Sequence, residues 1–547
     1  MNRLFYGDNL AVLRDHVKDE SVDLVYLDPP FNSNQDYNVL FAERDGSRAA
    51  AQIKAFSDTW QWDEGAARSY QETVEVGGRV SQALQAFRTF LGESDMLAYL
   101  AMMAPRLVEL RRVMKPTASI YLHCDPTASH YLKMLMDAVF GPENFRNEVI
   151  WKRTSSHSDA RQGAEHYGRV HDTLLFFGRS GSGVWNPQHI SHDESYVKTH
   201  YPRVNEATGR RYGLWDITGP GGAAKGNPRY EVLGVTKYWR YSEQRMREKI
   251  ASGRVIQPSP GAVPREVRYL DESEGAPLVT IWTDIPPINS QAQERLGYPT
   301  QKPVALLERI LSASSNPGDV VLDPFCGCGT TIDAAQKLGR AWIGIDVTHL
   351  AINLIKTRLR DSYGEEIGKT YTVIGEPTTV EGAEDLAQSD PYQFQWWALG
   401  LVGARPVEQK KGADKGIDGR IFFHDEQGGP TRQVILSVKA GGLHATYVRD
   451  LAGVIGREHA EIGVLLSLEE PTKPMRKEAA SAGFYTSPWG QHPRIQLLTV
   501  GELLAGKRID CPPLRQTDRT FKKAPRADTY EGEQGSLPLV AEHPDPD

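Results

Sequence analysis

The sequence has few cysteines and no long apolar run. Its 547 residues include four cysteines, which are too few and too unevenly spaced for a disulfide framework or a four-cysteine zinc site. No apolar stretch reaches the roughly 18 residues of a membrane span, and the first residues do not resemble a signal peptide. We therefore expect a cytoplasmic protein with no membrane partner.

Positive charge is also scarce in the chain as a whole. Lysine and arginine number 63 against 70 aspartates and glutamates, so the formal net charge is −7. This balance argues against nucleic-acid binding through overall charge, and any basic surface must be local. No repeat of fixed period is present, which argues against solenoids and propellers. The length and the 40% apolar composition predict two to four ordinary globular domains.

Strand and helix patterns alternate in two parts of the chain. Residues 21–28 are predicted to form a buried strand, which ends where Pro29 and Pro30 forbid further strand or helix. Periodicity predicts six more elements in order: a helix over 94–114 that Lys115-Pro116 stops, a strand over 118–123, a helix over 127–139, a strand over 319–323, a helix ending at Leu338 and a strand over 341–346. This alternation predicts a parallel, doubly wound α/β sheet.

Between these two parts lies a locally basic segment. Residues 151–254 contain 17 lysines and arginines against 10 aspartates and glutamates, a local balance of +7, with tyrosines and tryptophans interleaved. Basic residues mixed with aromatic ones are typical of nucleic-acid binding. A charged, solvated surface over an ordinary core has the same composition, so the composition alone leaves both interpretations open.

A glycine turn follows the predicted strand that ends at Asp323. Gly327 and Gly329 let the backbone pass close to a ligand, and Thr330 begins a helix whose free amides point toward that ligand. Asp346 lies 23 residues after Asp323, at the end of the next strand, where a carboxylate accepts hydrogen bonds from both ribose hydroxyls. The turn lacks the lysine of a phosphate-binding loop, and an acidic residue suits a cationic sulfonium. The expected cofactor is S-adenosylmethionine.

Cys326 and Cys328 form a Cys-x-Cys pair in the same turn. No second pair and no nearby histidine accompany them, so a metal site lacks the remaining ligands. We interpret both cysteines as small residues that fill the loop.

Asp28, Pro29, Pro30 and Phe31 form a rigid polar corner after the first buried strand. The exocyclic amino group of a base is a weak nucleophile because its lone pair is delocalised into the ring. Asp28 and the Pro29 carbonyl would each accept a hydrogen bond from that amino group, orienting its lone pair toward a methyl donor and stabilising the developing positive charge. Phe31 would stack on a base flipped out of the duplex. A proline-rich turn without catalytic function is the alternative interpretation.

Together these motifs resemble the amino-group DNA methyltransferases, whose signatures are Asp-Pro-Pro-Tyr/Phe and Phe-x-Gly-x-Gly. Further matches are Gly7-Asp8-Asn9, Lys115-Pro116 and the run Pro299-Thr300-Gln301-Lys302-Pro303. The catalytic motif precedes the cofactor motif, and a long segment separates them. The order is similar to the beta arrangement of that family.

The resemblance covers about residues 1–360 and implies a seven-stranded Rossmann-like methyltransferase fold. It implies that the basic segment recognises double-stranded DNA and that the protein forms a homodimer. It also implies a cofactor site, which would contain Asp8, Lys302, Asp323, Phe325, Gly327, Gly329, Thr330 and Asp346.

The catalytic motif also bears on the base that is methylated. In the family, aspartate at the position of Asp28 favours adenine N6, and serine there favours cytosine N4. Phe31 replaces the commoner tyrosine, which keeps the stacking plane and removes a hydroxyl. Methylation at cytosine C5 is excluded because the chain has no Pro-Cys dipeptide. Protein-glutamine methyltransferases have asparagine at this position, so Asp28 argues against them as well.

The region after about residue 390 resembles the Mrr-like endonucleases, which have the Asp…Glu/Gln-x-Lys motif. Asp418 precedes a predicted strand over 420–423, and Lys439 ends another over 433–439, so the pair would hold Mg²⁺ and activate water for phosphodiester cleavage. Ser437 stands where that family has Glu or Gln, which reduces the expected metal affinity; Asp414 is a further candidate ligand. The alternative is a nuclease fold that only binds DNA.

The predicted organisation has six parts: a methyltransferase catalytic part (1–150), a target-recognition segment (151–297), a cofactor-binding part (298–374), a linker (375–389), a restriction-endonuclease-like domain (390–510) and a disordered tail (511–547). The leading hypothesis is a site-specific DNA adenine-N6 methyltransferase of a restriction-modification or phage-defence system. The alternatives are a fused restriction enzyme that cleaves unmethylated DNA, an N4-cytosine methyltransferase, and a DNA-binding protein whose catalytic folds are idle.

Overall fold

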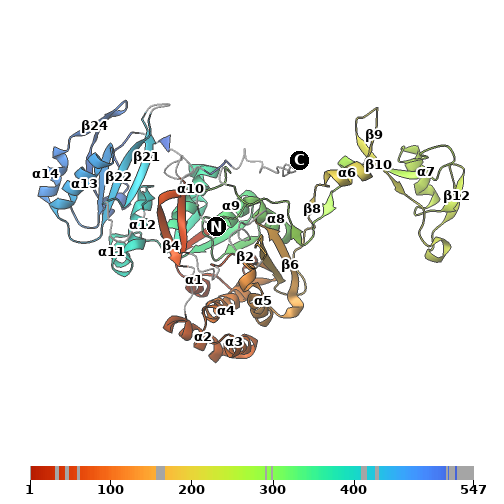
Figure 1. The fold of residues 1–547 in the computed structure, drawn as a ribbon, viewed down its shortest axis with the longest axis horizontal. Helices are drawn as coiled ribbons and strands as arrows, with labels where there is room; N and C mark the ends of the chain where they lie inside the picture. Colours follow the sequence, from red (N-terminus) through yellow and green to blue (C-terminus); the bar gives the residue numbers. More distant parts are fainter. Residues whose placement is uncertain are drawn as a thin grey trace. The chain divides into compact units, whose positions relative to one another are not determined.

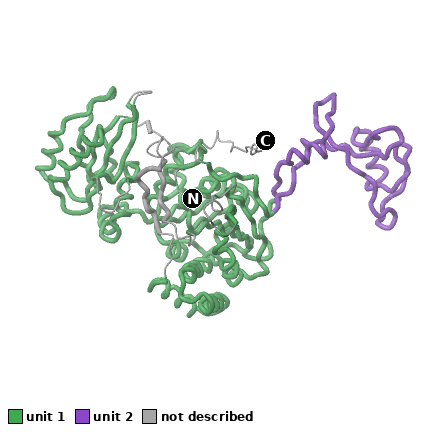
Figure 2. Tube along the Cα trace, in the orientation of Figure 1, with its two compact units in different colours: residues 1–186, 280–547 green, residues 187–279 purple. Residues whose placement is uncertain are grey.

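The computed structural model describes most of the chain, namely residues 2–30, 36–42, 48–57, 62–154, 165, 167–289, 292–296, 298, 300–407, 416–425, 430–512, 515–516 and 524–526. The chain divides into two compact units (Figure 2). Unit 1 comprises Met1–Asn186 and Thr280–Asp547, and unit 2 comprises Pro187–Val279. Among the described residues, no helix is both long enough and apolar enough to cross a membrane.

A nine-stranded sheet forms the centre of unit 1 (Figure 1), in the order β16-β6-β7-β5-β2-β17-β18-β1-β19. Neighbouring strands are parallel except that β7 runs antiparallel to both β5 and β6. Its strands are β1 (Asn2–Tyr6), β2 (Val22–Leu27), β5 (Met114–Cys124), β6 (Phe145–Lys152), β7 (His171–Gly178), β16 (Ile281–Trp282), β17 (Val320–Asp323), β18 (Ala341–Asp346) and β19 (Tyr371–Ile374).

Helices cover this sheet and bury its central strands. All six residues of β2 are buried, as expected for a parallel strand covered on both faces. The side chain of Ser94 accepts a hydrogen bond from the Leu97 amide and so caps the most buried long helix, α4. The helices are α1 (Asn9–His16), α2 (Glu64–Val76), α3 (Gly78–Leu91), α4 (Asp95–Val113), α5 (Pro126–Phe140), α8 (Val304–Ser314), α9 (Thr330–Lys337) and α10 (His349–Tyr363).

The strand order brings distant loops to one edge of the sheet. The strands β2 and β17 are parallel neighbours, with Val25 opposite Leu322, although about 300 residues separate them in the chain. The strands β1 and β18 are also parallel neighbours, with Tyr6 opposite Asp346. The loops that follow these four strands therefore leave the same carboxyl edge, where ligands bind in open α/β sheets.

The predicted elements of unit 1 agree with the structure to within a few residues, with three corrections. Lys115-Pro116 does not end α4 in a loop but lies inside β5, because the chain passes from Val113 directly into the strand. The sheet has nine strands rather than seven, since β16 adds to one edge and β19 to the other. It is mixed rather than wholly parallel, because β7 returns antiparallel beside β5.

Unit 2 contains a four-stranded sheet, β13-β14-β10-β9, a separate two-stranded ribbon, β11-β12, and the short pair β15-β8. Unit 2 covers fewer residues than the predicted segment 151–297, because β6, β7 and β16 belong to the main sheet of unit 1. Its elements are β8 (His189–Ile190), α6 (Glu194–His200), β9 (Arg203–Val204), β10 (Arg211–Asp216), β11 (Arg229–Val232), β12 (Val235–Tyr238), α7 (Glu243–Ala251), β13 (Val255–Ile256), β14 (Arg265–Tyr269) and β15 (Ala276–Pro277).

The C-terminal region has a second sheet, in the order β20-β21-β22-β23-β26. The predicted linker 375–389 is partly helical, since α11 spans Val380–Ser389. Most of the tail 511–547 lies outside the described residues, and so does the prediction that it is disordered. The main elements are α12 (Pro391–Leu401), β20 (Arg405–Pro406), β21 (Gly419–His424), β22 (Arg432–Lys439), α13 (Ala445–Arg457), β23 (Ile462–Ser467), α14 (Lys473–Ser481) and β26 (Ile495–Thr499).

Candidate functional site

A cavity of about 320 Å³ opens at the carboxyl ends of β1, β2, β17 and β18. It brings together residues from both ends of the predicted methyltransferase part. The predicted site residues that line it are Asp8, Asp28, Pro29, Pro30, Lys302, Asp323, Phe325, Gly327, Thr330 and Asp346. Gly329 lies in the turn without lining the cavity, and Phe31 lies outside the described residues.

The Asp28 carboxylate is held by a lysine from a distant part of the chain. Lys302 Nζ lies 2.6 Å from Asp28 Oδ2, and both side chains are mostly buried, with exposed fractions of 12% and 16%. The sequence assigned Lys302 to the cofactor site, but the structure places its ammonium group on Asp28. Because Pro29 and Pro30 follow directly, the backbone beside this carboxylate is rigid.

The two other acidic residues of the site lie after β17 and β18. Asp346 Oδ2 accepts a hydrogen bond from the Gly327 amide at 2.9 Å, and its Oδ1 accepts from the amide and hydroxyl of Thr348. Asp323 Oδ1 accepts from the Phe325 amide at 3.0 Å. Each carboxylate oxygen has two lone pairs, so both residues retain capacity to accept bonds from a ligand.

Burial controls the charge of these two carboxyl groups. It raises the pKa of Asp323 to about 7, and the negative charges of Asp28 and Asp346 contribute to this rise. Burial also raises the pKa of Asp346 to about 6. Groups with such pKa values change charge within the physiological range, which is common at functional sites.

The glycine turn adopts a backbone that other residues disfavour. Gly327 and Gly329 have φ angles of +48° and +76°, in the left-handed region. A Cβ on Gly329 would lie 2.7 Å from Ile355 Cγ1, so α10 packs directly against the turn. Buried Arg358, one turn further along α10, also binds the turn: its guanidinium donates to the Cys328 carbonyl and pairs with Asp333 at 2.9 Å.

The two cysteines of the turn are buried, with 5% and 4% of their surface exposed. Burial raises the pKa of both thiols, which keeps them neutral. No group of three or more potential metal ligands occurs among the described residues. These observations agree with the interpretation of Cys326 and Cys328 as residues that fill the loop.

Several lining residues were missed by the sequence analysis. Arg106 of α4 donates to Asn9 Oδ1 at 2.6 Å and to Asp8 Oδ1 at 2.5 Å, and Asn9 donates to the Pro324 carbonyl. This network ties the loop after β1 to the loop after β17. An arginine in the middle of an otherwise apolar helix was the signal for such a role, because a buried charge requires partners.

A second missed feature is a chain of buried polar side chains next to the Asp28-Pro29 corner. Tyr26, two residues before Asp28 on β2, hydrogen bonds through its hydroxyl to His123 Nδ1 at 2.8 Å. His123 Nε2 lies 3.1 Å from Asp172 Oδ2, and Arg153 lies 3.3 Å from the other oxygen. Although burial alone would raise the pKa of Asp172, the hydrogen bond from His123 and the charges of His123, Lys302 and Arg153 lower it.

The ionised Asp172 fixes one end of this chain. His123 Nε2 donates to the carboxylate, and His123 Nδ1 shares its hydrogen bond with the Tyr26 hydroxyl, which is able to donate or accept. Tyr26 lines the cavity. The phenol is therefore held in one orientation beside Asp28.

The candidate nuclease residues meet in the C-terminal sheet. Asp418 directly precedes β21, and Lys439 ends the neighbouring strand β22. Lys439 Nζ lies 3.9 Å from Asp418 Oδ2. Asp418 already accepts hydrogen bonds from Gln395, from the Ser437 hydroxyl at 3.2 Å and from the Val438 amide at 2.6 Å. Asp414 lies outside the described residues. Among the described residues of this region, Asp418 is the one predicted carboxylate ligand, and it is engaged by three protein donors, whereas Mg²⁺ needs several oxygen ligands.

Comparisons with known proteins find similarity to DNA methyltransferases. The type II methyltransferase M.EcaI of Enterobacter cloacae is 27% identical over 361 residues, which cover 65% of this chain and 69% of that protein. The DNA adenine methyltransferase YhdJ of Escherichia coli is 24% identical and covers 65% of this chain and 82% of that protein. The crystal structure of the M1.HpyAVI–SAM complex is 15% identical, covers 63% of this chain and 93% of that chain, and has a TM-score of 0.29.

A family profile spans most of the region that contains the cavity. It is the profile of the N6/N4 DNA methylases, and it matches residues 22–357. The matched range begins with β2, which ends one residue before Asp28, and continues past Asp346 into α10. The chain belongs to the N6/N4 DNA methylase family.

Proposed function

We propose that the protein transfers a methyl group from S-adenosylmethionine to the N6 amino group of adenine in double-stranded DNA. One observation carries the proposal: the Asp28-Pro29 corner and the turn containing Gly327, with Asp346 beside it, line the same cavity. A nucleophile at the first corner and a methyl donor at the second would thus lie within one enclosure, as direct transfer requires.

The residues of the cavity support specific roles in this reaction. Asp28 and the Pro29 carbonyl accept hydrogen bonds from the amino group and stabilise its developing positive charge. Lys302 holds the Asp28 carboxylate in position. Asp346 would bind the ribose hydroxyls, and Asp323 would hold the cationic part of the cofactor. Bound S-adenosylmethionine would supply an electrophilic methyl group to the amino nitrogen with loss of its carbon–sulfur bond, and the proton released by the nitrogen would pass to solvent.

The target base must leave the helix to reach this cavity. Base flipping is the general solution for enzymes that modify bases in duplex DNA. Phe31, adjacent to the described corner, is proposed to stack on the flipped base. Adenine N6 is preferred to cytosine N4 because Asp28 stands at the first position of the motif. Methylation of cytosine N4 by the same site is the alternative, since the family covers both reactions.

Sequencing DNA from cells that express the protein, with detection sensitive to modified bases, tests this proposal. Wild type should give N6-methyladenine at one sequence motif, and Asp28→Ala should remove the signal. Glu72→Ala, on the exposed surface of α2, is the control and should leave the signal unchanged. Methylcytosine at the motif would favour the alternative base. An unchanged signal in Asp28→Ala would contradict the proposed site.

For residues 390–510 we propose a nuclease-like fold that binds DNA without Mg²⁺-dependent cleavage. The basis is the juxtaposition of Asp418 and Lys439 together with the engaged state of the Asp418 carboxylate. Incubation of the purified protein with unmethylated plasmid and Mg²⁺ should leave the DNA intact. Cutting under these conditions, lost in Asp418→Ala, would instead establish a fused restriction enzyme. A homodimer is also proposed, and light scattering during size-exclusion chromatography would test it.

A further inference from the structure

The positive charge of unit 2 is confined to one segment. Unit 2 contains 14 lysines and arginines against 11 aspartates and glutamates, a net charge of +3. Residues 219–240 contain four of those cations, Lys225, Arg229, Lys237 and Arg240, and a single acidic residue, Glu231. The segment therefore has a net charge of +3, and the rest of unit 2 is electrically neutral.

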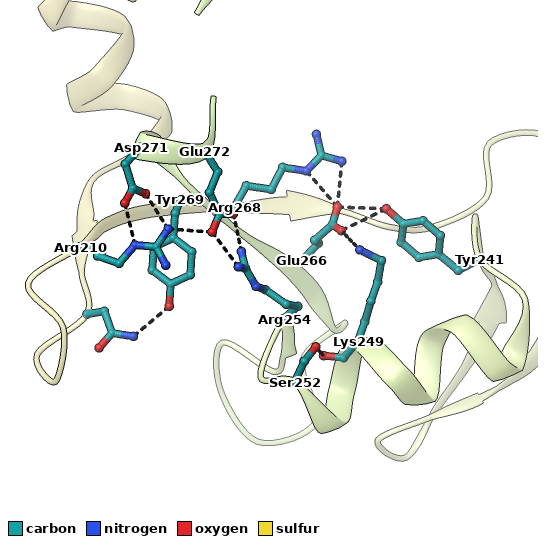
Figure 3. Close-up of polar contacts among 11 residues, drawn as sticks. Arg210, Tyr241, Lys249, Ser252, Arg254, Glu266, Arg268, Tyr269, Asp271 and Glu272 are labelled. Atoms are coloured by element: carbon teal, nitrogen blue, oxygen red, sulfur yellow. Dashed lines mark hydrogen bonds and ion pairs between the residues drawn. The ribbon is translucent and has the colours of Figure 1, made fainter. Parts of the chain in front are cut away.

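Six of the ten other cations of unit 2 are paired with acidic residues of the same unit, and four of the six are drawn in Figure 3. The guanidinium of Arg210 contacts both Asp271 and Glu272, and Arg254 also binds Glu272. Both arginines lie over the ring of Tyr269, at 3.9 and 4.9 Å from its centroid. These paired arginines hold the four-stranded sheet together and offer little charge to a partner.

A second paired group surrounds the buried carboxylate of Glu266. Lys249 lies 2.5 Å from Glu266 Oε1, Arg268 lies 2.8 Å from Oε2, and the Tyr241 hydroxyl donates to the same carboxylate (Figure 3). The structure describes every residue of unit 2, and within the unit no ion pair is formed by the four cations of the charged segment, Lys225, Arg229, Lys237 and Arg240. Four other cations of unit 2 also have no ion pair, but they come from four different elements: Arg203, Arg211, Arg245 and Arg265.

The charged segment folds into the separate ribbon β11-β12 and the glycine-rich loop before it. One face of the ribbon packs on the core of unit 2 through Tyr230, Val232 and Val235. The other face is largely exposed and presents two cross-strand pairs, Arg229 with Tyr238 and Glu231 with Thr236. We call this exposed face, together with Lys225, the ribbon face.

The glycine-rich loop places Lys225 beside the same ribbon face. The backbone of Gly222 lies so close to Tyr238 that an added Cβ would be 3.3 Å from its ring, and the Lys225 stem lies against Gly221. The Arg229 guanidinium lies 6.0 Å from the centroid of the Tyr238 ring. Arg229 thus lies beside the half-buried Tyr238, and Lys225 belongs to the short helical turn whose Gly222 packs on the same ring.

The tip of the ribbon has an unusual residue. Leu233 has a φ of +47°, a left-handed conformation that leucine disfavours, and Gly234 follows with a φ of +80°. Gln257 donates to the Leu233 carbonyl at 2.7 Å, which fixes the turn. The leucine is nevertheless 44% exposed, so its side chain has little packing to compensate for the strain of its backbone. The tip of the ribbon therefore presents an exposed apolar side chain on a strained backbone.

We propose that the ribbon face and its tip contact the major groove of duplex DNA. The groove admits a two-stranded β-ribbon, and phosphates border it on both sides. Lys225 and Arg229 bind phosphates, Glu231 and Thr236 face base edges, and Leu233 contacts an apolar edge such as the methyl group of thymine. This inference rests on the proposed function because it assigns the DNA contacts of the same enzyme.

Binding of a mixed-sequence duplex oligonucleotide to the full-length protein tests the proposed phosphate contacts of Lys225 and Arg229. For Lys225→Ala/Arg229→Ala we expect the slope of log K against log salt to fall by about 2, since each phosphate contact contributes about 0.9. The matched control is Lys198→Ala/Arg247→Ala, which removes two exposed cations that have partners within α6 and α7. The control should change the slope little. Equal losses in both variants, or no loss in the ribbon variant, would overturn the proposal.

Leu233→Gly tests the tip, because glycine adopts the left-handed conformation without strain. The melting temperature should stay the same or rise, whereas methylation at the preferred motif in expressing cells should fall. A variant that keeps wild-type methylation would show that the tip does not contact DNA. The oligonucleotide experiment needs no methyl transfer, so an inactive wild type that still binds through the ribbon face would refute the proposed function and leave this inference standing.

Discussion

Lys302 Nζ lies 2.6 Å from Asp28 Oδ2, although the two residues are 274 positions apart in the sequence. The contact joins the loop before α8 to the end of β2 and gives a mostly buried carboxylate its counter-ion. Removing one partner of such a pair leaves a buried charge uncompensated. The ion pair therefore couples the catalytic corner to the part of the chain that forms the cofactor turn.

We predict that Lys302→Met lowers the single-turnover rate of methyl transfer by about 10- to 100-fold, because the Asp28 carboxylate loses the contact that orients it. The double variant Asp28→Asn/Lys302→Met should be no slower than Asp28→Asn alone, since an amide needs no counter-ion. Quenched-flow assays with saturating DNA would measure both. Lys133→Met, which removes a lysine paired with Asp137 on α5, serves as the control. Additive losses would contradict coupling between the two residues.

Asp323→Asn should stabilise the protein and abolish cofactor binding. Burial raises the pKa of Asp323 from 3.8 to about 7, so the free energy of unfolding falls as the pH rises from about 4 to about 7. Asparagine does not ionise, and the variant should gain at most about 4 kcal/mol at pH 8, with the gain shrinking as the pH falls. Calorimetry without cofactor at several pH values would measure the gain.

A neighbouring aspartate provides the opposite case for comparison. Asp333 pairs with the fully buried Arg358, so Asp333→Asn leaves that arginine without its counter-ion and should destabilise the protein by roughly 3 kcal/mol. If both substitutions destabilised the protein at pH 8, the ionised Asp323 would not be a source of strain in the fold.

Binding of S-adenosylmethionine should strengthen as the pH rises. The cofactor is cationic at sulfur, and it is favoured by ionised carboxylates at Asp323 and Asp346, whose pKa values are about 7 and about 6. Affinity should increase by at least about tenfold between about pH 5 and pH 8, with release of protons on binding. Calorimetry in two buffers of different ionisation enthalpy would count these protons. Affinity that does not change across this range would refute the roles of both carboxylates.

The sequence predicts four of the nine strands of the main sheet of unit 1, namely β2, β5, β17 and β18, because these are apolar and bounded by clear breakers. The strand predicted over 341–346 matches β18, and the helix predicted over 94–114 matches α4 to within one residue at each end. The same patterns place Asp28 and Asp323 at strand ends. Parallel strands share a carboxyl edge, so a common cavity follows once β2 and β17 are neighbours.

Contacts between distant segments were not available from local patterns. The pairing of Lys302 with Asp28, and of Arg106 with Asp8, depends on three-dimensional packing that neither spacing nor periodicity encodes. Composition also misled in the basic segment: Tyr201 and Trp239 are core residues, and Arg210 and Arg254 are neutralised by acidic residues beyond position 254. The charge available to DNA is therefore smaller, and more localised, than a count of residues suggests.

The chain Tyr26–His123–Asp172 predicts a difference between two substitutions at one site. Tyr26→Phe removes the hydroxyl that hydrogen bonds to His123 Nδ1, leaving a buried ring nitrogen unpaired, and should lower the free energy of unfolding by about 1–3 kcal/mol. Tyr26→Phe/His123→Phe also takes the Nε2 donor from the buried Asp172 carboxylate and should lower the free energy of unfolding further. Urea denaturation of the three proteins would measure the series.

The same variants separate a structural role from a positioning role. If the chain holds the Tyr26 ring beside Asp28, Tyr26→Phe should lower kcat by about tenfold with little change in KM for DNA, because the corner is less rigidly placed in the transition state. The double variant loses further stability, but the ring has already lost the hydrogen bond that orients it, so its kcat should match that of Tyr26→Phe. A kcat that falls further, in step with stability, would mean that the chain serves only the fold.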